Sequence, residues 1–327
     1  MNPWILFINI TSIIMAIISI VLNSLLLYAY FKCSLKTISV YRYFLFLFAA
    51  NGIFFSLVQG TTTPVSMAEQ QLSALIAVGF LGTTPIGSFG LLLFYDATLF
   101  VLLLNVNCFL YRFFLLCRPN LLCIYNQKKY AIMAVIVNAI IVADWTATAL
   151  ITMTPREEFT ALFRDIALRI AQVDLTFTSH FGLQPSVLYQ NPVKLILFSQ
   201  FYIITISLVL VIIYCTYKIV RTLTAAVSPQ TKRMHKEMFH LLLYQLLNPV
   251  TFLYIPFFAS STLATLNMMN VDKICALLCA LYSIFPVINP LITIRYVKEY
   301  RVFLKRMIRS QLAKGHGVTT HTVTAVK

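Results

Sequence analysis

The chain has 327 residues, of which 60% are hydrophobic and 11% charged, and its formal net charge at pH 7 is +15. Soluble domains contain about 45–50% apolar and about 25% charged residues, so this composition excludes a soluble enzyme, a disordered tail and a secreted disulfide scaffold. A strongly basic chain is typical of nucleic-acid-binding proteins, but here the basic residues lie between long apolar runs. The composition therefore predicts a single membrane-embedded bundle, with no nucleic-acid partner.

Seven runs are long and apolar enough to cross a bilayer as helices, which takes about 20 mostly apolar residues for ~30 Å of hydrocarbon. They are residues 5–31, 43–65, 90–116, 131–153, 195–217, 239–263 and 274–294. The first run has no basic residues before it and is longer than the apolar part of a signal peptide. It therefore predicts a retained first span.

The basic residues orient these spans. Of the 25 lysines and arginines, 20 lie on one side of the predicted bundle, in 32–42, 112–129, 218–236 and 295–327. Cytoplasmic loops carry the excess of Lys and Arg in membrane proteins. We therefore expect an all-α bundle of seven transmembrane helices, with its N-terminus outside and its C-terminus inside.

Residues 72–90 form a further apolar stretch that tests the count of seven spans. They contain four glycines and a proline, which weaken a helix. An eighth span would also invert every later loop and leave most basic residues outside. We expect this stretch to be an outer loop over the mouth of the bundle.

Two shorter segments have the periodicity of amphipathic helices. The first lies in the outer segment 154–192, where apolar residues recur at helical spacing: Phe159, Leu162, Phe163, Ile166 and Ile170. The second is 298–309, whose basic face predicts a helix in the inner membrane interface, held by apolar burial and anionic lipid. Residues 1–309 would then form the seven-helix transmembrane domain and 310–327 a disordered cytoplasmic tail.

Polar residues inside the predicted spans are candidate functional positions because they are costly in hydrocarbon unless paired. Asn23, Asn51 and Asn289 either form interhelical hydrogen bonds or belong to a polar cluster that rearranges between two states. Prolines predict kinks in the sixth and seventh spans; they are Pro249, Pro256, Pro286 and Pro290.

Charged residues in the spans raise similar alternatives. Asp96, next to Tyr95, either binds a cationic ligand or pairs with a neighbouring helix, and we expect a neighbour to satisfy Asp144. Arg112, next to Tyr111, lies at the inner end of the third span. It either extends its side chain to the interface or locks the inner ends of other helices.

Enzymatic chemistry has no support in the motifs. Signatures of zinc proteases, serine hydrolases, nucleotide-binding loops and dinucleotide-binding turns are absent from the sequence, and no His, Cys and carboxylate spacing fits a metal site. The seven cysteines offer no pair in the outer loops, so we expect no structural disulfide. The sequence predicts a protein that is not an enzyme and that needs no cofactor.

The order of several motifs resembles a known family. Residues 109–114 read Phe-Leu-Tyr-Arg-Phe-Phe, and 117–120 read Cys-Arg-Pro-Asn. They are similar to the third-span signature of nematode serpentine chemoreceptors of the Str superfamily, in which a Tyr-Arg pair stands in place of the acidic-Arg-Tyr motif of rhodopsin-like receptors. Stretches 237–256 and 285–301 also match, so the resemblance extends to about residue 309. The Str and Srj branches are closest, and Srd and Srh relatives stay open.

This resemblance implies a seven-helix G-protein-coupled chemoreceptor of sensory neurons, carried to the plasma membrane of the cilium. Tyr111 and Arg112 would face the G protein, and Asn289 and Pro290 would form the hinge of the seventh span. One departure is Asn51, which stands where an acidic residue is common. The cysteine pair that links the third span to the second outer loop in rhodopsin-like receptors is also absent.

We therefore expect an olfactory-type receptor that binds a small, apolar odorant in the outer half of the bundle and activates a heterotrimeric G protein. Depth along the spans suggests the ligand-binding residues: Leu92, Tyr95, Asp96, Leu99, Tyr254, Phe257, Phe258 and Tyr282. The alternatives are a transporter and a ligand-gated channel subunit. Transporters usually show paired intramembrane charges and two matching halves, and the charge bias opposes an inverted channel.

Overall fold

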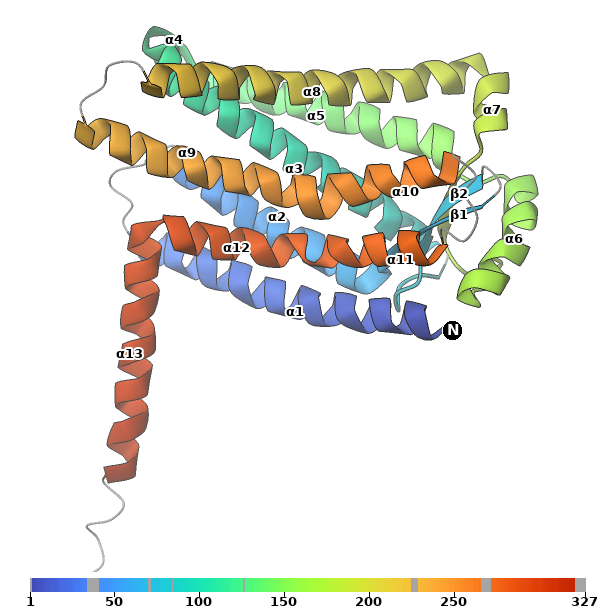
Figure 1. The fold of residues 1–327 in the computed structure, drawn as a ribbon, viewed down its shortest axis with the longest axis horizontal. Helices are drawn as coiled ribbons and strands as arrows, with labels where there is room; N and C mark the ends of the chain where they lie inside the picture. Colours follow the sequence, from blue (N-terminus) through green and yellow to red (C-terminus); the bar gives the residue numbers. More distant parts are fainter. Residues whose placement is uncertain are drawn as a thin grey trace, which may run out of the picture.

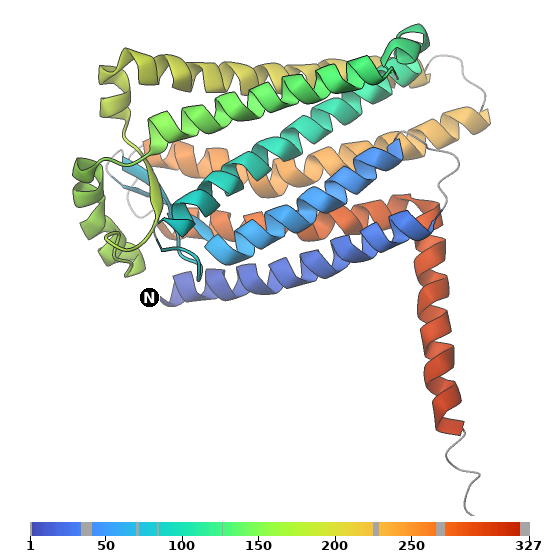
Figure 2. The ribbon, with the colours of Figure 1, turned by 180° about the vertical axis from the view of Figure 1, so that it is seen from behind.

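The computed structural model describes residues 2–33, 41–69, 72–83, 85–125, 127–224, 229–265 and 272–320. Long helices lie side by side in a bundle, and the N-terminus lies at the same end as a small sheet and helix α6 (Figure 1). Helix α13 leaves the opposite end and points sideways, away from the bundle (Figures 1 and 2). From the charge bias we name the end with the sheet the outer end and the end with α13 the inner end.

The bundle contains the seven predicted spans, five of them as continuous helices: α1 (Pro3–Lys32), α2 (Tyr41–Thr62), α3 (Ile86–Cys117), α5 (Lys128–Met153) and α8 (Pro192–Thr224). The sixth span consists of α9 (Pro229–Pro249), the π-helical η1 (Val250–Tyr254) and α10 (Ile255–Thr265). The seventh consists of α11 (Asp272–Ala280), the 3₁₀ turn η2 (Leu281–Ser283) and α12 (Phe285–Tyr296). Among the described residues, six helices are long and apolar enough to span a membrane, and a bent pair with an angle of 41° makes the seventh.

The second span ends earlier than its apolar run. Thr63 adopts a φ of 41° and Pro64 follows it. A left-handed threonine is incompatible with continuing a right-handed helix, and the proline has no N–H to donate into one. The predicted end at residue 65 is therefore wrong, and α2 stops at Thr62.

A three-stranded antiparallel sheet covers part of the outer end, in the order β1 (Pro64–Glu69), β2 (Leu72–Ala77) and β3 (His180–Leu183). The expected loop at 72–90 is thus a strand, followed by the early start of α3 at Ile86. β1 and β3 provide hydrogen bonds that a single apolar stretch cannot make for itself, which is why periodicity alone missed the sheet.

Helix α6 (Glu157–Ala171) packs on this sheet and confirms the predicted amphipathic helix. Phe159, Phe163 and Ile166 are buried, whereas Leu162 of the predicted apolar face is exposed. A Cβ added at Gly182 of β3 would overlap the Phe159 ring, so the helix lies directly on the strand backbone. We call the sheet and α6 together the outer cap. The short α7 (Pro185–Gln190) connects the cap to α8.

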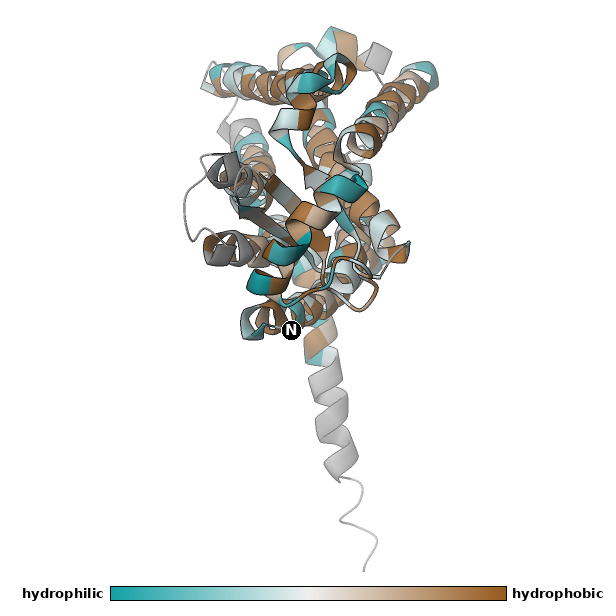
Figure 3. Ribbon diagram, turned by 90° about the vertical axis from the view of Figure 1, so that its right-hand side faces the viewer, coloured by the Kyte–Doolittle hydropathy of each residue, from teal (hydrophilic) through white to brown (hydrophobic). Residues whose placement is uncertain are grey.

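Large apolar side chains are exposed on the outside of the bundle as well as buried in its core. Figure 3 looks onto the outer end and shows hydrophobic stretches, in brown, along the helices. Helix α3 is central and contacts α2, α5, α8 and α9. Phe55 of α2 is fully buried, with ring centroids 5.5 Å from Phe94 of α3 and 5.3 Å from Phe285 of α12. These aromatic contacts join three spans.

At the inner end lie α4 (Pro119–Tyr125) and α13 (Lys298–Thr320). Tyr300 and Leu304 are buried, and they attach the first turns of α13 to the bundle. The helix extends past the predicted end at residue 309, so the expected disorder from residue 310 is wrong as far as Thr320. No proline follows Arg309 in this stretch, and helical backbone bonding continues.

Candidate functional site

A cavity of about 500 Å³ lies in the outer half of the bundle, between α3, α5, α8 and the sixth span. Small-molecule pockets in proteins typically measure about 300–1,000 Å³. The described side chains around it include none that is charged; they are Phe94, Tyr95, Thr98, Leu99, Leu102, Trp145, Phe201, Thr205, Val209, Val250, Leu253, Tyr254, Ile255, Phe257, Phe258, Ala259, Thr262 and Tyr282.

Six of the residues suggested by depth line this cavity: Tyr95, Leu99, Tyr254, Phe257, Phe258 and Tyr282. Leu92 and Asp96 do not. Sequence reasoning missed the contributions of α5 and α8, chiefly Trp145 and Phe201, whose rings lie 4.2 Å apart between centroids. Depth along a span can be estimated from sequence, but which face of α5 or α8 turns inward depends on the packing.

Asp96 and Asp144, the acidic residues inside the predicted spans, are used between helices. Asp96 Oδ1 accepts a hydrogen bond from Thr146 Oγ1 of α5 at 2.8 Å. Asp144 Oδ1 accepts one from Gln200 Nε2 of α8 at 2.8 Å. Asp96 therefore pairs with a neighbouring helix rather than turning to the cavity, and Asp144 has the neighbour expected for it.

The π-helical η1 shapes one wall of the cavity. It lies between Pro249 and Pro256, and the N–H of Ile255 donates to the Val250 carbonyl. Pro256 has no N–H for the carbonyl four residues earlier, which favours a local change of helix type. The wider turn lets Val250, Leu253 and Tyr254 line the cavity, and the Tyr254 hydroxyl donates to the Thr98 carbonyl of α3 at 3.2 Å.

One polar group in the cavity wall lacks a hydrogen bond. Trp145 is 9% exposed, and its Nε1 donor has no partner among the described residues. A buried unpaired donor costs about 1–3 kcal/mol. The nitrogen has almost no exposed surface, so other atoms of the indole line the cavity and Nε1 does not face its open space.

A second cavity of about 290 Å³ lies between the outer cap and the first cavity. Tyr95, Phe201, Phe257 and Phe258 line both. Tyr95 contacts Phe257 of α10 edge-on, at 6.1 Å between ring centroids. These four aromatic residues form the partition between an outer vestibule and the deeper cavity.

A polar cluster joins the first, second and seventh spans at mid-bundle. In a regular helix the N–H of residue 290 would bond to the carbonyl of Pro286, but Pro290 has none. Ser19 Oγ donates to this carbonyl at 3.0 Å and Asn23 Nδ2 at 3.1 Å. Ser56 Oγ of α2 in turn donates to Ser19 Oγ at 2.6 Å.

The sixth span is held to α12 in the same region. Asn248 Nδ2 donates to the Phe285 carbonyl at 2.9 Å, and Gln245 Nε2 donates to Thr293 Oγ1 at 3.2 Å. Thr293 Oγ1 also donates to the Asn289 carbonyl at 3.1 Å. Asn289 is buried here, and Asn51 is buried on α2.

Tyr111 and Arg112 lie on the inner half of α3 and are 7% and 3% exposed. Tyr111 packs on Phe44 of α2, at 5.9 Å between ring centroids. Arg112 does not extend its side chain to the interface, which would expose it. Its buried position among the inner ends of the spans fits the alternative of a locking contact.

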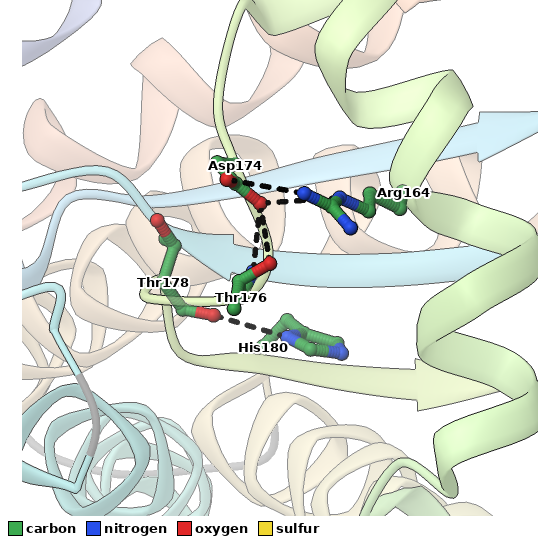
Figure 4. A network of polar contacts seen from close by, with 5 residues as sticks. All are labelled: Arg164, Asp174, Thr176, Thr178 and His180. Atoms are coloured by element: carbon green, nitrogen blue, oxygen red, sulfur yellow. Dashed lines mark hydrogen bonds and ion pairs between the residues drawn. The ribbon is translucent and has the colours of Figure 1, made fainter.

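The loop between α6 and β3 carries the polar network of Figure 4. Asp174 Oδ1 accepts from the Thr176 N–H at 3.0 Å and from Thr176 Oγ1 at 2.7 Å, and these bonds lower the Asp174 pKa. His180 Nδ1 lies 3.1 Å from the Thr178 carbonyl, and burial lowers the His180 pKa. The network fixes the position of β3 and of the cap.

The described part of the chain shows neither a candidate metal site nor a disulfide bond. Its His, Cys, Asp and Glu residues include no group of three or more that could hold a metal ion. The cysteines whose side chains are described are free thiols: Cys33, Cys108, Cys117, Cys215 and Cys279.

A family model described as "Serpentine type 7TM GPCR chemoreceptor Str" matches residues 8–305. The chain belongs to this family of serpentine chemoreceptors. Among curated relatives of this Str-family chain, the serpentine receptor class r-10 of Caenorhabditis elegans is 23% identical over 318 residues, covering 91% of this chain and 90% of the relative. The protein of the same name from Caenorhabditis briggsae is 22% identical over 287 residues, covering 81% and 80%.

Squid rhodopsin is a structural neighbour of this Str-family protein. The TM-score is 0.58 at 14% identity, and the match covers 100% of this chain and 94% of the rhodopsin. At this identity the similarity shows the fold. The protein is therefore a multi-pass membrane protein with the seven-helix fold of G-protein-coupled receptors, in a receptor family rather than an enzyme family.

Proposed function

We propose that this receptor binds a small, uncharged and mainly apolar odorant in the 500 Å³ cavity and then activates a heterotrimeric G protein at its inner end. The observation that carries the proposal is the cavity itself. Aromatic side chains from six elements line it, and its described lining has no charged group. A charged ligand would lose its hydration in such a site without gaining a partner.

The unpaired donor of Trp145 narrows the ligand class. A ketone, ester, ether or alcohol oxygen would accept the Nε1 hydrogen bond after a rotation of the indole that turns this buried nitrogen into the cavity, while the rest of the molecule fills the apolar space. Pure hydrocarbons would leave this donor unsatisfied. We therefore expect ligands with one oxygen acceptor to bind better than hydrocarbons of the same shape.

Signal transmission would use the sixth span. A ligand in the cavity contacts α3 and η1 together, on either side of the Tyr254 bond to the Thr98 carbonyl. If the bundle can adopt two arrangements of its helices, a ligand changes their populations only when it binds one arrangement more tightly than the other. A ligand that prefers one spacing of α3 and η1 would therefore shift the sixth span about its prolines and alter the inner end.

At the inner end, Tyr111 and Arg112 would contact or release the G protein, and Asn289 and Pro290 would act as the hinge of α12. The family resemblance supports these roles, as it supports a position in the plasma membrane of a sensory cilium. Helix α13 would lie on the lipid of the inner leaflet. Its sideways direction from the bundle is the one this role requires (Figure 1).

The test is a G-protein activation assay in cells that express the full chain, with a panel of small volatile compounds grouped by oxygen content. Leu99→Trp fills the cavity from α3 and is expected to abolish the response. Phe100→Trp is the matched control, because Phe100 is on the same helix, is 36% exposed and does not line the cavity. Equal responses from both variants at equal surface expression would contradict binding in this cavity.

Arg112→Ala separates binding from coupling. It is expected to keep the receptor at the surface and to lose G-protein activation. Ligand-dependent current, or uptake of a panel compound without G-protein activation, would instead favour the channel or the transporter.

A further inference from the structure

A second site lies at the inner end, away from the odorant cavity. A groove of about 350 Å³ runs between the inner ends of α3 and α8. Arg118, Lys218 and Arg221 line it, and no acidic residue does. Three cations thus border one small groove.

These cations have no counter-charge in the described part of the chain. The ion pairs there are Arg164 with Asp174 and Arg169 with Glu69, both in the outer cap. Lys218 Nζ lies 5.7 Å from the centroid of the Tyr214 ring and makes a cation–π contact. Three cations that repel one another in one groove favour an anionic occupant.

The walls of the groove are held in place by contacts between the two helices. The Phe113 and Tyr214 rings lie 5.8 Å apart between centroids, and Cys117 Sγ lies 3.2 Å from Thr222 Oγ1. The groove therefore has an aromatic floor on the bilayer side and a basic rim at the inner end. Its shape does not depend on a single flexible side chain.

The position of the groove points to lipid. On α8, Cys215 and Ile219 are buried in the bundle, whereas Tyr214 is 54% exposed on the flank. Exposed tyrosines at the ends of apolar helices lie at the depth of lipid headgroups, and cations one turn further along reach the phosphates. Tyr214, which lines the groove, is therefore on the surface that faces lipid.

We propose that the groove formed by Arg118, Lys218, Arg221, Phe113 and Tyr214 binds an anionic phospholipid of the inner leaflet, with a headgroup of more than one negative charge. The phosphates lie against the three cations. The glycerol and upper acyl chains cross the two aromatic rings. The site is independent of the odorant cavity and of whether the receptor couples to a G protein.

The experiment uses the purified full chain in nanodiscs of phosphatidylcholine, with phosphatidylinositol 4,5-bisphosphate or phosphatidylserine added. Native mass spectrometry counts the retained lipid, and a titration gives its affinity. For the double variant Lys218→Ala/Arg221→Ala we expect about 30-fold weaker binding of the bisphosphate lipid, since each cation near an anionic surface contributes about fivefold. Lys128→Ala/Lys129→Ala removes the same charge from the inner end outside the groove, and we expect it to retain wild-type affinity.

Four outcomes would overturn the proposal. Three concern the lipid itself: equal losses in the two double variants, no retained anionic lipid in the wild type, or displacement of the lipid by soluble inositol trisphosphate at equal concentration, which would indicate a site for soluble phosphates. A groove variant that binds lipid normally but loses G-protein coupling would assign the surface to the protein partner instead. Lys218→Arg, which keeps the charge, is expected to retain the lipid and controls for folding.

Discussion

The Pro286 carbonyl offers the sharpest test of how the spans are held together. Pro290 deprives this carbonyl of its normal donor, and Ser19 and Asn23 of α1 replace it at 3.0 and 3.1 Å. Asn23→Ala removes one of these donors and Pro290→Ala restores the N–H within α12. The two substitutions should therefore be coupled, although the residues lie on different spans.

The magnitude follows from the contacts. Side-chain hydrogen bonds between membrane helices contribute on average about 0.6 kcal/mol and at most about 1.7 kcal/mol. Asn23 Nδ2 also donates to the Ser19 carbonyl at 2.9 Å, while Asn23 Oδ1 has no partner among the described residues. We expect Asn23→Ala alone to destabilise the receptor by about 1 kcal/mol. In the Pro290→Ala background, Asn23→Ala should leave the free energy of unfolding nearly unchanged.

The assay measures the free energy of unfolding in mixed micelles for the wild type, both single variants and the double variant. A coupling energy of about 1 kcal/mol is expected. If the effects of the two single variants add up to the effect of the double variant within about 0.3–0.5 kcal/mol, the reasoning is refuted. Asn138→Ala is the control. Asn107 of α3 donates to Asn138 of α5 at 3.0 Å, away from α12, so its effect should add to that of Pro290→Ala.

Three further predictions concern the outer cap. Burial lowers the His180 pKa, so below its ordinary value of about 6.5 the unfolded cap binds more protons than the folded one. The contribution of His180 to cap stability should be fully present above that pH and should be lost as the pH drops through it. Hydrogen exchange of the cap amides at neutral and mildly acidic pH measures this loss. A His180→Gln variant with the same pH dependence would contradict it. Gly182→Ala, whose new Cβ overlaps Phe159, should cost about 1–3 kcal/mol and lower the unfolding midpoint, and an unchanged midpoint would argue against the close packing. Arg169→Ala should change stability by less than about 1 kcal/mol, because its pair with Glu69 is 64% exposed on the arginine side; a larger loss in denaturation would show that the pair is structural.

Much of the architecture was predictable from composition and periodicity. Each span has to bury about 20 residues in hydrocarbon, so a long apolar run is itself the signal, and the loop charges orient the bundle. The amphipathic α6 was also predictable, because its apolar residues recur on one face. Depth along the spans selected six residues of the cavity, among them Tyr95 and Tyr282.

What the sequence left open depends on contacts between distant segments. β2 pairs with β3 more than 100 residues later, and neither strand has a local pattern that requires the other. Asp96 turns to Thr146, Trp145 turns to the cavity, and the Pro286 carbonyl recruits Asn23, and each of these depends on how helices rotate about their own axes. An apolar span is nearly uniform around its circumference, so hydropathy sets where it crosses the membrane but not which face it turns inward. Only the packing of side chains and the pairing of buried polar groups decide that rotation, and with it the shape of the site.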